Sequence, residues 1–189
     1  MNVEEPVYIR LPKVQIWRRG VAFAIDYLVV SVVVSVVGGA GGNVTLGQMV
    51  LFLILWLGMR AIAPLANRGQ SLGRWALDMK VVDWQGRTPL LVDLLKREAI
   101  AGGGAAFAML GLSQIAPGQG VGMLFLLPLA IDCSVASTDL FRRQAFHDRI
   151  AGTLVVATRR GFSLDLKVRK WYFLVQQWIE AISQRNSRP

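Results

Sequence analysis

Four long apolar segments limit what this chain can fold into more than any other feature. They span about residues 21–37, 46–66, 94–115 and 120–137. A helix needs roughly 20 mostly apolar residues to cross a bilayer, and each segment is close to that length. Charged residues make up 17% of the chain, whereas ordinary soluble domains carry about a quarter. We therefore expect an all-α membrane protein with about four transmembrane helices, not a soluble domain with a large core.

The first segment also resembles a secretory signal peptide, because Arg18 and Arg19 precede it and small residues follow it. Its length and the presence of Asp26 favour a retained helix instead. In the third segment, Gly102-Gly103-Gly104-Ala105-Ala106 should let helix backbones approach closely. In the fourth, Pro128 predicts a kink.

The distribution of Lys and Arg predicts the orientation. The connections 38–45 and 113–119 carry no Lys or Arg. All the basic residues outside the apolar segments lie in the N-terminal region, the middle loop or the C-terminal region, which the positive-inside rule places in the cytoplasm. We expect both termini and the middle loop on the cytoplasmic side, and the net charge of +9 suits an anionic lipid surface.

The cytoplasmic parts contain two strand-like runs and an amphipathic tail. Val81-Val82, followed by a turn at Gln85-Gly86, and residues 153–158 predict two strands that could pair into a small sheet. In the tail, six apolar residues recur at helical spacing with basic residues nearby, which suits a helix in the membrane interface or one that docks a partner protein. These six residues are Leu164, Val168, Trp171, Val175, Trp178 and Ile182.

Charges inside the apolar segments indicate a polar cluster. Asp26 lies seven residues beyond Arg19, which corresponds to a depth of about 10 Å at 1.5 Å per residue. Arg60, Asp132 and Arg97 lie at similar depths in the other segments. Ionisable groups in a membrane are costly, so the cluster of Asp26, Arg60, Arg97 and Asp132 either serves transport or pairs charges to fix helix register. Asp26 is the best candidate for a carboxylate that binds a proton or a cation.

Other functional classes find little support. The residues 69–74 lack the Lys-Ser/Thr ending of a phosphate-binding loop, and no recognition motif for nucleic acid accompanies the basic residues. The single cysteine, Cys133, cannot form an internal disulfide or a zinc cluster. His147 has no nucleophile or base arranged around it in the sequence. We therefore expect no catalytic residues, cofactor, metal or nucleic-acid partner.

Three motifs, in order, resemble the RDD family of bacterial membrane proteins, which is named for one arginine and two aspartates. Arg19 and Asp26 match the element of the first helix, residues 69–87 resemble the family's glycine-rich element, and residues 143–153 match its His-Asp-Arg-x-Ala-Gly-Thr element. The match implies that Arg19, Asp26, His147 and Asp148 are motif residues, with Asp148 the second aspartate. Four spans depart from the three that are commoner in the family.

The resemblance covers about residues 17–158, which we take as the transmembrane domain, between an N-terminal cytoplasmic segment 1–16 and a tail helix 159–189. It implies a multi-pass protein of a bacterial cytoplasmic (inner) or internal membrane with a transport role, and cation/proton exchange is associated with some members of the family. Our first hypothesis is a transporter or transporter subunit for a cation or small solute, as an oligomer. The alternative is a non-transporting accessory or assembly factor of a larger membrane complex.

Overall fold

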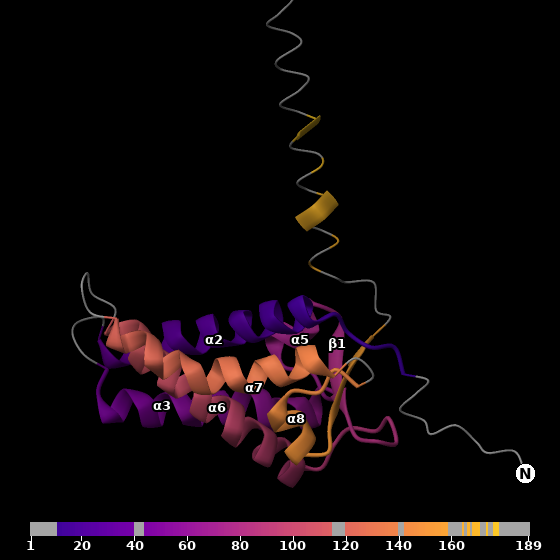
Figure 1. Ribbon diagram of the computed structural model, residues 1–189, viewed down its shortest axis with the longest axis horizontal. Coiled ribbons are helices and arrows are strands. Elements are labelled where there is room, and N and C mark those ends of the chain that lie inside the picture. The colour runs from indigo at the N-terminus through magenta and orange to yellow at the C-terminus, as the bar shows by residue number, and fades with distance from the viewer. Residues whose placement is uncertain are drawn as a thin grey trace, which may run out of the picture.

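The chain folds into four long helical segments with short elements gathered at one end (Figure 1). The computed structural model describes residues 11–39, 44–114, 120–139, 142–158 and isolated positions between 164 and 177. The long segments are α2 (Ile16–Gly38), α3 with its continuations η1 and α4 (Leu46–Leu57, Gly58–Ile62, Ala63–Ala66), α6 (Leu91–Ser113), and η2 with α7 (Val121–Leu126, Leu127–Thr138). The short elements are α5 (Leu72–Ala76), β1 (Met79–Val82), α8 (Phe146–Ile150) and β2 (Leu154–Ala157).

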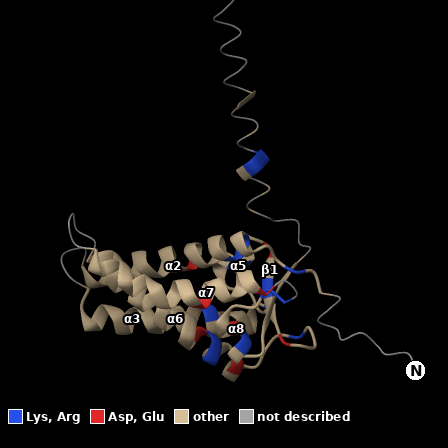
Figure 2. Ribbon diagram, in the orientation of Figure 1, with Lys and Arg blue, Asp and Glu red and all other residues tan. Residues whose placement is uncertain are grey.

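The long helices lie side by side, with α3 packed against α2 and α6, and α7 against α6. We call the end that holds α5, α8 and the two strands the polar end. In Figure 2, most of the bundle's ribbon that is coloured as Lys, Arg, Asp or Glu lies at this end and along the adjoining parts of the helices. At the opposite end, Gly38 lies beside Gln48, and Gly111 lies against Gly122.

Three of the four long segments are long and apolar enough to cross a membrane: Ile16–Gly38, Leu46–Ala66 and Val121–Thr138. This confirms the prediction of membrane-spanning helices, but it does not confirm the count of four. The remaining segment, α6, has the same length as α2, 23 residues. Its first two turns carry four charged residues, which lower its mean hydropathy: Asp93, Lys96, Arg97 and Glu98.

The surface of α2 has the character of a lipid-facing helix. Leu28, Val32 and Val36 follow one another at intervals of four, so they share one face. All three are exposed, by 60%, 59% and 79%. An apolar face of this kind is unfavourable in water and favourable against acyl chains.

The two predicted strands pair, as expected. β1 and β2 are antiparallel, with Met79 opposite Ala157 and Val82 opposite Leu154. The turn after β1 is held by the Asp83 carboxylate, which accepts hydrogen bonds from the backbone N–H groups of Gln85 and Arg87, both at 2.8 Å. The pair closes the polar end of the bundle and lies next to α5.

Close packing between α3 and α6 depends on Gly102. A Cβ atom at this position would lie 2.6 Å from Cδ1 of Trp56, a fully buried ring. At the next residue, Gly103, an added Cβ would meet nothing within 4 Å. Within the glycine run, Gly102 is therefore needed for close helix packing, whereas Gly103 is not.

We expect Gly102→Ala to destabilise the protein by about 1–3 kcal/mol, because the rigid indole ring and the helix backbone must separate. Gly103→Ala should be neutral or slightly stabilising, because alanine is the better helix former. Thermal unfolding in detergent, followed by tryptophan fluorescence, compares the two variants. Equal midpoints for both would contradict this packing.

The C-terminal tail lies largely outside the described residues, and so do Trp171, Val175, Trp178 and Ile182 of its predicted apolar face. The positions that are described, such as Leu164 and Val168, are helical.

Candidate functional site

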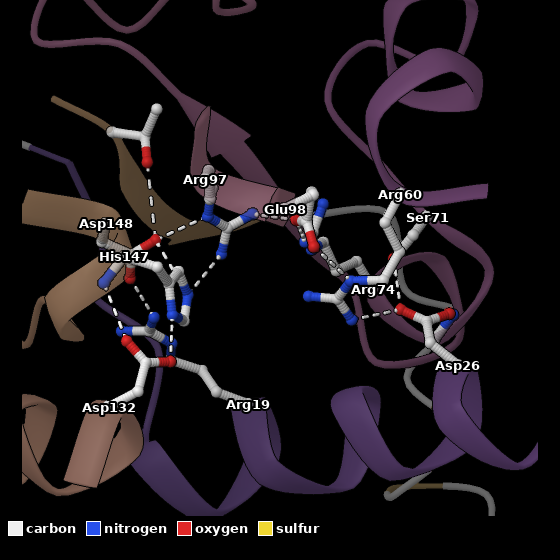
Figure 3. A network of polar contacts seen from close by, with 12 residues as sticks. Arg19, Asp26, Arg60, Ser71, Arg74, Arg97, Glu98, Asp132, His147 and Asp148 are labelled. Carbon is white, nitrogen blue, oxygen red and sulfur yellow. Dashed lines mark hydrogen bonds and ion pairs between the residues drawn. The ribbon is translucent and has the colours of Figure 1, made fainter. Parts of the chain in front are cut away.

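A chain of buried ion pairs crosses the polar end of the bundle (Figure 3). It begins at Asp26 on α2, whose side chain is fully buried. One carboxylate oxygen, Oδ2, accepts hydrogen bonds from Nη1 of Arg60 and from the hydroxyl of Ser71, both at 2.7 Å. The other oxygen accepts from the backbone N–H of Gly73 at 2.7 Å. Two of the three donors to this carboxylate, Ser71 and Gly73, thus come from the glycine-rich residues 69–74.

Arg60 connects Asp26 to the next acid. It lies in the π-helical turn η1, and its Nε donates to Oε2 of Glu98 at 2.8 Å. The guanidinium carbon lies 4.7 Å from the ring centre of Trp56 and 5.1 Å from that of Phe23. The aromatic faces therefore add a cation–π contribution to the two ion pairs.

Glu98 on α6 is the centre of the network. Besides Arg60, its carboxylate accepts hydrogen bonds from Nη2 of Arg74 at 2.5 Å and from Nη1 of Arg97 at 3.0 Å. Its side chain is fully buried. A single carboxylate thus neutralises part of the charge of three arginines that come from η1, α5 and α6.

Arg97 continues the chain to Asp148 on α8. Its Nε donates to Oδ1 of Asp148 at 2.7 Å. The other oxygen of Asp148 pairs with Nη2 of Arg19 on α2. The Thr153 hydroxyl, 3.4 Å from Oδ1, also faces this carboxylate. The ion pair of Arg19 and Asp148 ties the first helix to the end of the domain.

His147 and Asp132 complete the network. The Asp132 carboxylate accepts a hydrogen bond from the backbone N–H of His147 at 2.8 Å, and its second oxygen contacts Nδ1 of the imidazole. Nε2 of the same ring lies 3.4 Å from Nη2 of Arg97 and 3.5 Å from Oδ1 of Asp148. The imidazole therefore bridges an acid on α7 and the Arg97–Asp148 pair.

The network balances four arginines against four carboxylates. The arginines are Arg19, Arg60, Arg74 and Arg97, and the carboxylates are Asp26, Glu98, Asp132 and Asp148. Burying charges carries a large desolvation cost, which ion pairs offset only when their geometry is good and their remaining hydrogen bonds are made. The balance is what makes burial of so many charges tolerable.

Among the described residues outside the long helices, Asp148 and Arg74 have shifted pKa values. Burial alone would raise the pKa of Asp148, but the positive charges of Arg97 and Arg19 outweigh it and hold the pKa well below its usual value of 3.8. Burial and the nearby charges of Arg60 and Arg97 lower the pKa of Arg74 to about 9. Both groups remain charged at neutral pH.

The Asp148 shift predicts acid sensitivity. Because its folded-state pKa is lower than in the unfolded chain, its ion pairs contribute stability that is fully present above about pH 4 and lost as pH falls toward the folded-state value. The thermal unfolding midpoint of the wild type, measured from pH 6 to pH 3, should decrease once the pH is below about 4. Asp148→Asn should have a lower midpoint at pH 6 and a flatter dependence below pH 4. Parallel curves would contradict the assignment.

The four residues predicted as an intramembrane cluster all belong to this network, although only two of them contact each other directly. Asp26 and Arg60 are in direct contact, whereas Arg97 reaches Arg60 through Glu98, and Asp132 reaches Arg97 through His147. The motif residues Arg19, Asp26, His147 and Asp148 are all members too.

Sequence reasoning missed Arg74, Ser71 and the role of Glu98. Glu98 directly follows Arg97 and lies at the same predicted depth, which was a usable signal. Arg74 and Ser71 belong to the glycine-rich segment, and only its folding over α2 brings them to the site.

Apolar helices of membrane-spanning length, tied together at one end by buried ion pairs, define a small helical membrane protein. The model of the RDD family matches residues 13–152, a range that includes every charged member of the network. The chain belongs to the RDD family. No curated protein and no solved structure gives a significant match to it.

Proposed function

We propose that this protein is a small membrane transporter, or a transporter subunit, for a cation or small solute, and that it is not an enzyme. The observation that carries the proposal is the burial of seven of the network's eight charged side chains, together with His147, in contact with the long helices. Ionisable groups at membrane depth are costly and most often serve the passage of ions, protons or solutes.

A fourth crossing by α6 is part of this proposal. Near one end of α6, Arg97 pairs with Asp148 at the polar end; near the other, Gly111 lies against Gly122 at the start of η2. The helix therefore runs the same course as its three apolar neighbours. With four crossings and the basic residues inside, both termini lie in the cytoplasm. Reporter fusions after Arg87, which precedes α6, and after Ser113 at its end test this: opposite sides are expected, and the same side would contradict a crossing by α6.

Asp132 and His147 are the best supported site for a proton or cation. Asp26, favoured by the sequence, already accepts three hydrogen bonds, including one from Arg60. Asp132 instead has an imidazole and a backbone N–H as its partners among the described residues. The pair couples a carboxylate to an imidazole, and chains of these side chains form the proton relays of many membrane transporters.

A non-transporting accessory role is the second candidate. It is favoured by the way three of the four carboxylates are held by arginines, since such pairs can serve only to fix helix register. In that case, the protein would act through partners in a larger membrane complex.

Flux measurements separate the two candidates. The purified chain is reconstituted into liposomes that contain a pH-sensitive dye, and a sodium, potassium or proton gradient is applied. Transport predicts a dye response above that of protein-free liposomes. The absence of a response under every gradient, together with co-purifying membrane proteins in mild detergent, would favour the accessory role. A dimer in detergent would fit a pathway completed by a second copy.

A further inference from the structure

A cavity of about 120 Å³ lies between α2 and α7 and is bounded by β1 and β2. Five groups capable of positive charge line it: Arg19, Arg60, Arg74, Arg97 and His147. Among the described residues, no aspartate or glutamate lines it. A water molecule needs only about 10–15 Å³ of such space, so the cavity has room for a group of several heavy atoms.

Arg74 supplies a donor that the ion pairs do not use. The residue is 2% exposed, and its Nη2 donates to Glu98. Its Nη1 is buried and has no hydrogen-bond partner within the described part of the chain. A buried donor without a partner is unfavourable, so a ligand that accepts from Nη1 would relieve a cost already present in the fold.

The network as a whole is balanced, but Arg60, Arg74 and Arg97 share the single carboxylate of Glu98. Burial lowers the pKa of Arg74, and repulsion from Arg60 and Arg97 lowers it further, although Glu98 and Asp26 act in the opposite direction. The surroundings of Arg74 would therefore accommodate an additional negative charge.

Part of the cavity lining is apolar. It is formed by Ile16, Gly20 and Phe23 of α2 and by Cys133 and Ala136 of α7. Ile16 is 38% exposed and Cys133 is also exposed, so the cavity is bordered by residues on the outer surface of the bundle. Basic side chains in the interior and an apolar border suit a ligand with a small anionic group and a hydrophobic remainder.

We infer that this cavity binds a phosphate group, carried by an anionic lipid or present as the free ion, with Nη1 of Arg74 as a principal donor. Guanidinium groups pair with phosphate through planar, charge-assisted hydrogen bonds, and several of them converge on this one space. The inference does not depend on transport, because an accessory protein could hold the same ligand.

The test uses the full chain and its single cysteine, Cys133, as a reporter at the cavity. Alkylation of Cys133 by N-ethylmaleimide is measured in nanodiscs of phosphatidylcholine alone, of phosphatidylcholine with phosphatidylglycerol, and of phosphatidylcholine with inorganic phosphate in the buffer. Sodium chloride at matched ionic strength controls for screening. A ligand at ten times its dissociation constant should slow alkylation about elevenfold, if the thiol reacts only in the empty cavity.

Two variants locate the ligand. Arg74→Lys keeps a positive charge near Glu98 but removes the second guanidinium nitrogen, and we expect phosphate to bind about tenfold more weakly. Ala136→Leu adds bulk to the cavity wall without removing a charge. The ligand should then no longer fit, and Cys133 should lose its protection against alkylation. Arg87→Gln, which removes an exposed cation that does not line the cavity, should retain the protection of the wild type.

Protection by phosphatidylglycerol alone would identify a lipid as the source of the phosphate, and protection by inorganic phosphate would identify the free ion. Either result supports the inference when both cavity variants reduce the protection. If neither source slows alkylation of the wild type beyond the chloride control, the inference is overturned. Equal protection in the wild type, Arg74→Lys and Ala136→Leu would overturn it as well.

Discussion

Replacing Glu98 with glutamine is expected to lower the free energy of unfolding by about 3–5 kcal/mol, because the change leaves buried arginines without their shared counter-charge. Three guanidinium groups donate to this carboxylate at 2.5–3.0 Å, and the side chain is fully buried. Unfolding in detergent, by heat or by denaturant, gives the size of the effect through tryptophan fluorescence.

The matched control for Glu98 is Asp93→Asn on the same helix. Asp93 is partly exposed in the first turn of α6, where its charge contributes only a small favourable interaction with the helix dipole. We expect a change well below 1 kcal/mol for this variant. Similar losses for Glu98→Gln and Asp93→Asn would show that the three-arginine centre does not hold the helices together.

Gly73→Ala is expected to have the second large effect, a destabilisation of about 3 kcal/mol, at the upper end of the usual cost of overpacking. An added Cβ would lie 2.0 Å from the backbone oxygen of Ala22, and neither backbone can yield without moving α5 away from α2. That movement would also withdraw the Gly73 N–H from Asp26. The thermal midpoint should fall, and hydrogen exchange in residues 69–76 should increase.

Gly20→Ala provides the control for Gly73. Gly20 lies on α2, the helix that Gly73 approaches, but an added Cβ at this position meets nothing within 4 Å. Its midpoint should stay at or slightly above that of the wild type, because alanine favours the helix. A Gly73→Ala variant as stable as Gly20→Ala would contradict the close approach of α5 to α2.

The long helices and the strand pair were predictable because their signals are local. Runs of apolar residues set the helices to within a few residues, and α2 begins at Ile16, five residues before the predicted start at Val21. The alternation and β-branched residues around Val81 and Val155 indicated strands that pair with each other. In both cases, neighbours in the sequence carry the information.

Membrane depth predicted part of the site, but not its connections. Counting residues from the helix ends placed Asp26 and Arg60 at one level, and these two residues do form an ion pair. The same count says nothing about the direction in which a side chain points around its helix. For that reason, Glu98 as the partner of Arg60, and His147 as the partner of Asp132, emerged only from the folded chain.

The glycine-rich segment shows the same limit. A phosphate-binding loop at residues 69–74 was rejected because the Lys-Ser/Thr ending is missing. In the fold, Ser71 and Gly73 donate to a carboxylate of the protein itself, and Arg74 reaches both Glu98 and the cavity. These contacts join residues more than twenty positions apart, so no local pattern predicts them.

The proposed function is tested most directly by measuring proton movement in liposomes that contain the Asp132→Asn variant. With a sodium or potassium gradient and a pH-sensitive dye inside the liposomes, the wild type should move protons, and Asp132→Asn should give the response of protein-free liposomes. Asp93→Asn, an acid of α6 outside the network, should match the wild type. Proton movement by Asp132→Asn at the wild-type rate would contradict the assignment of the Asp132–His147 pair as the exchange site.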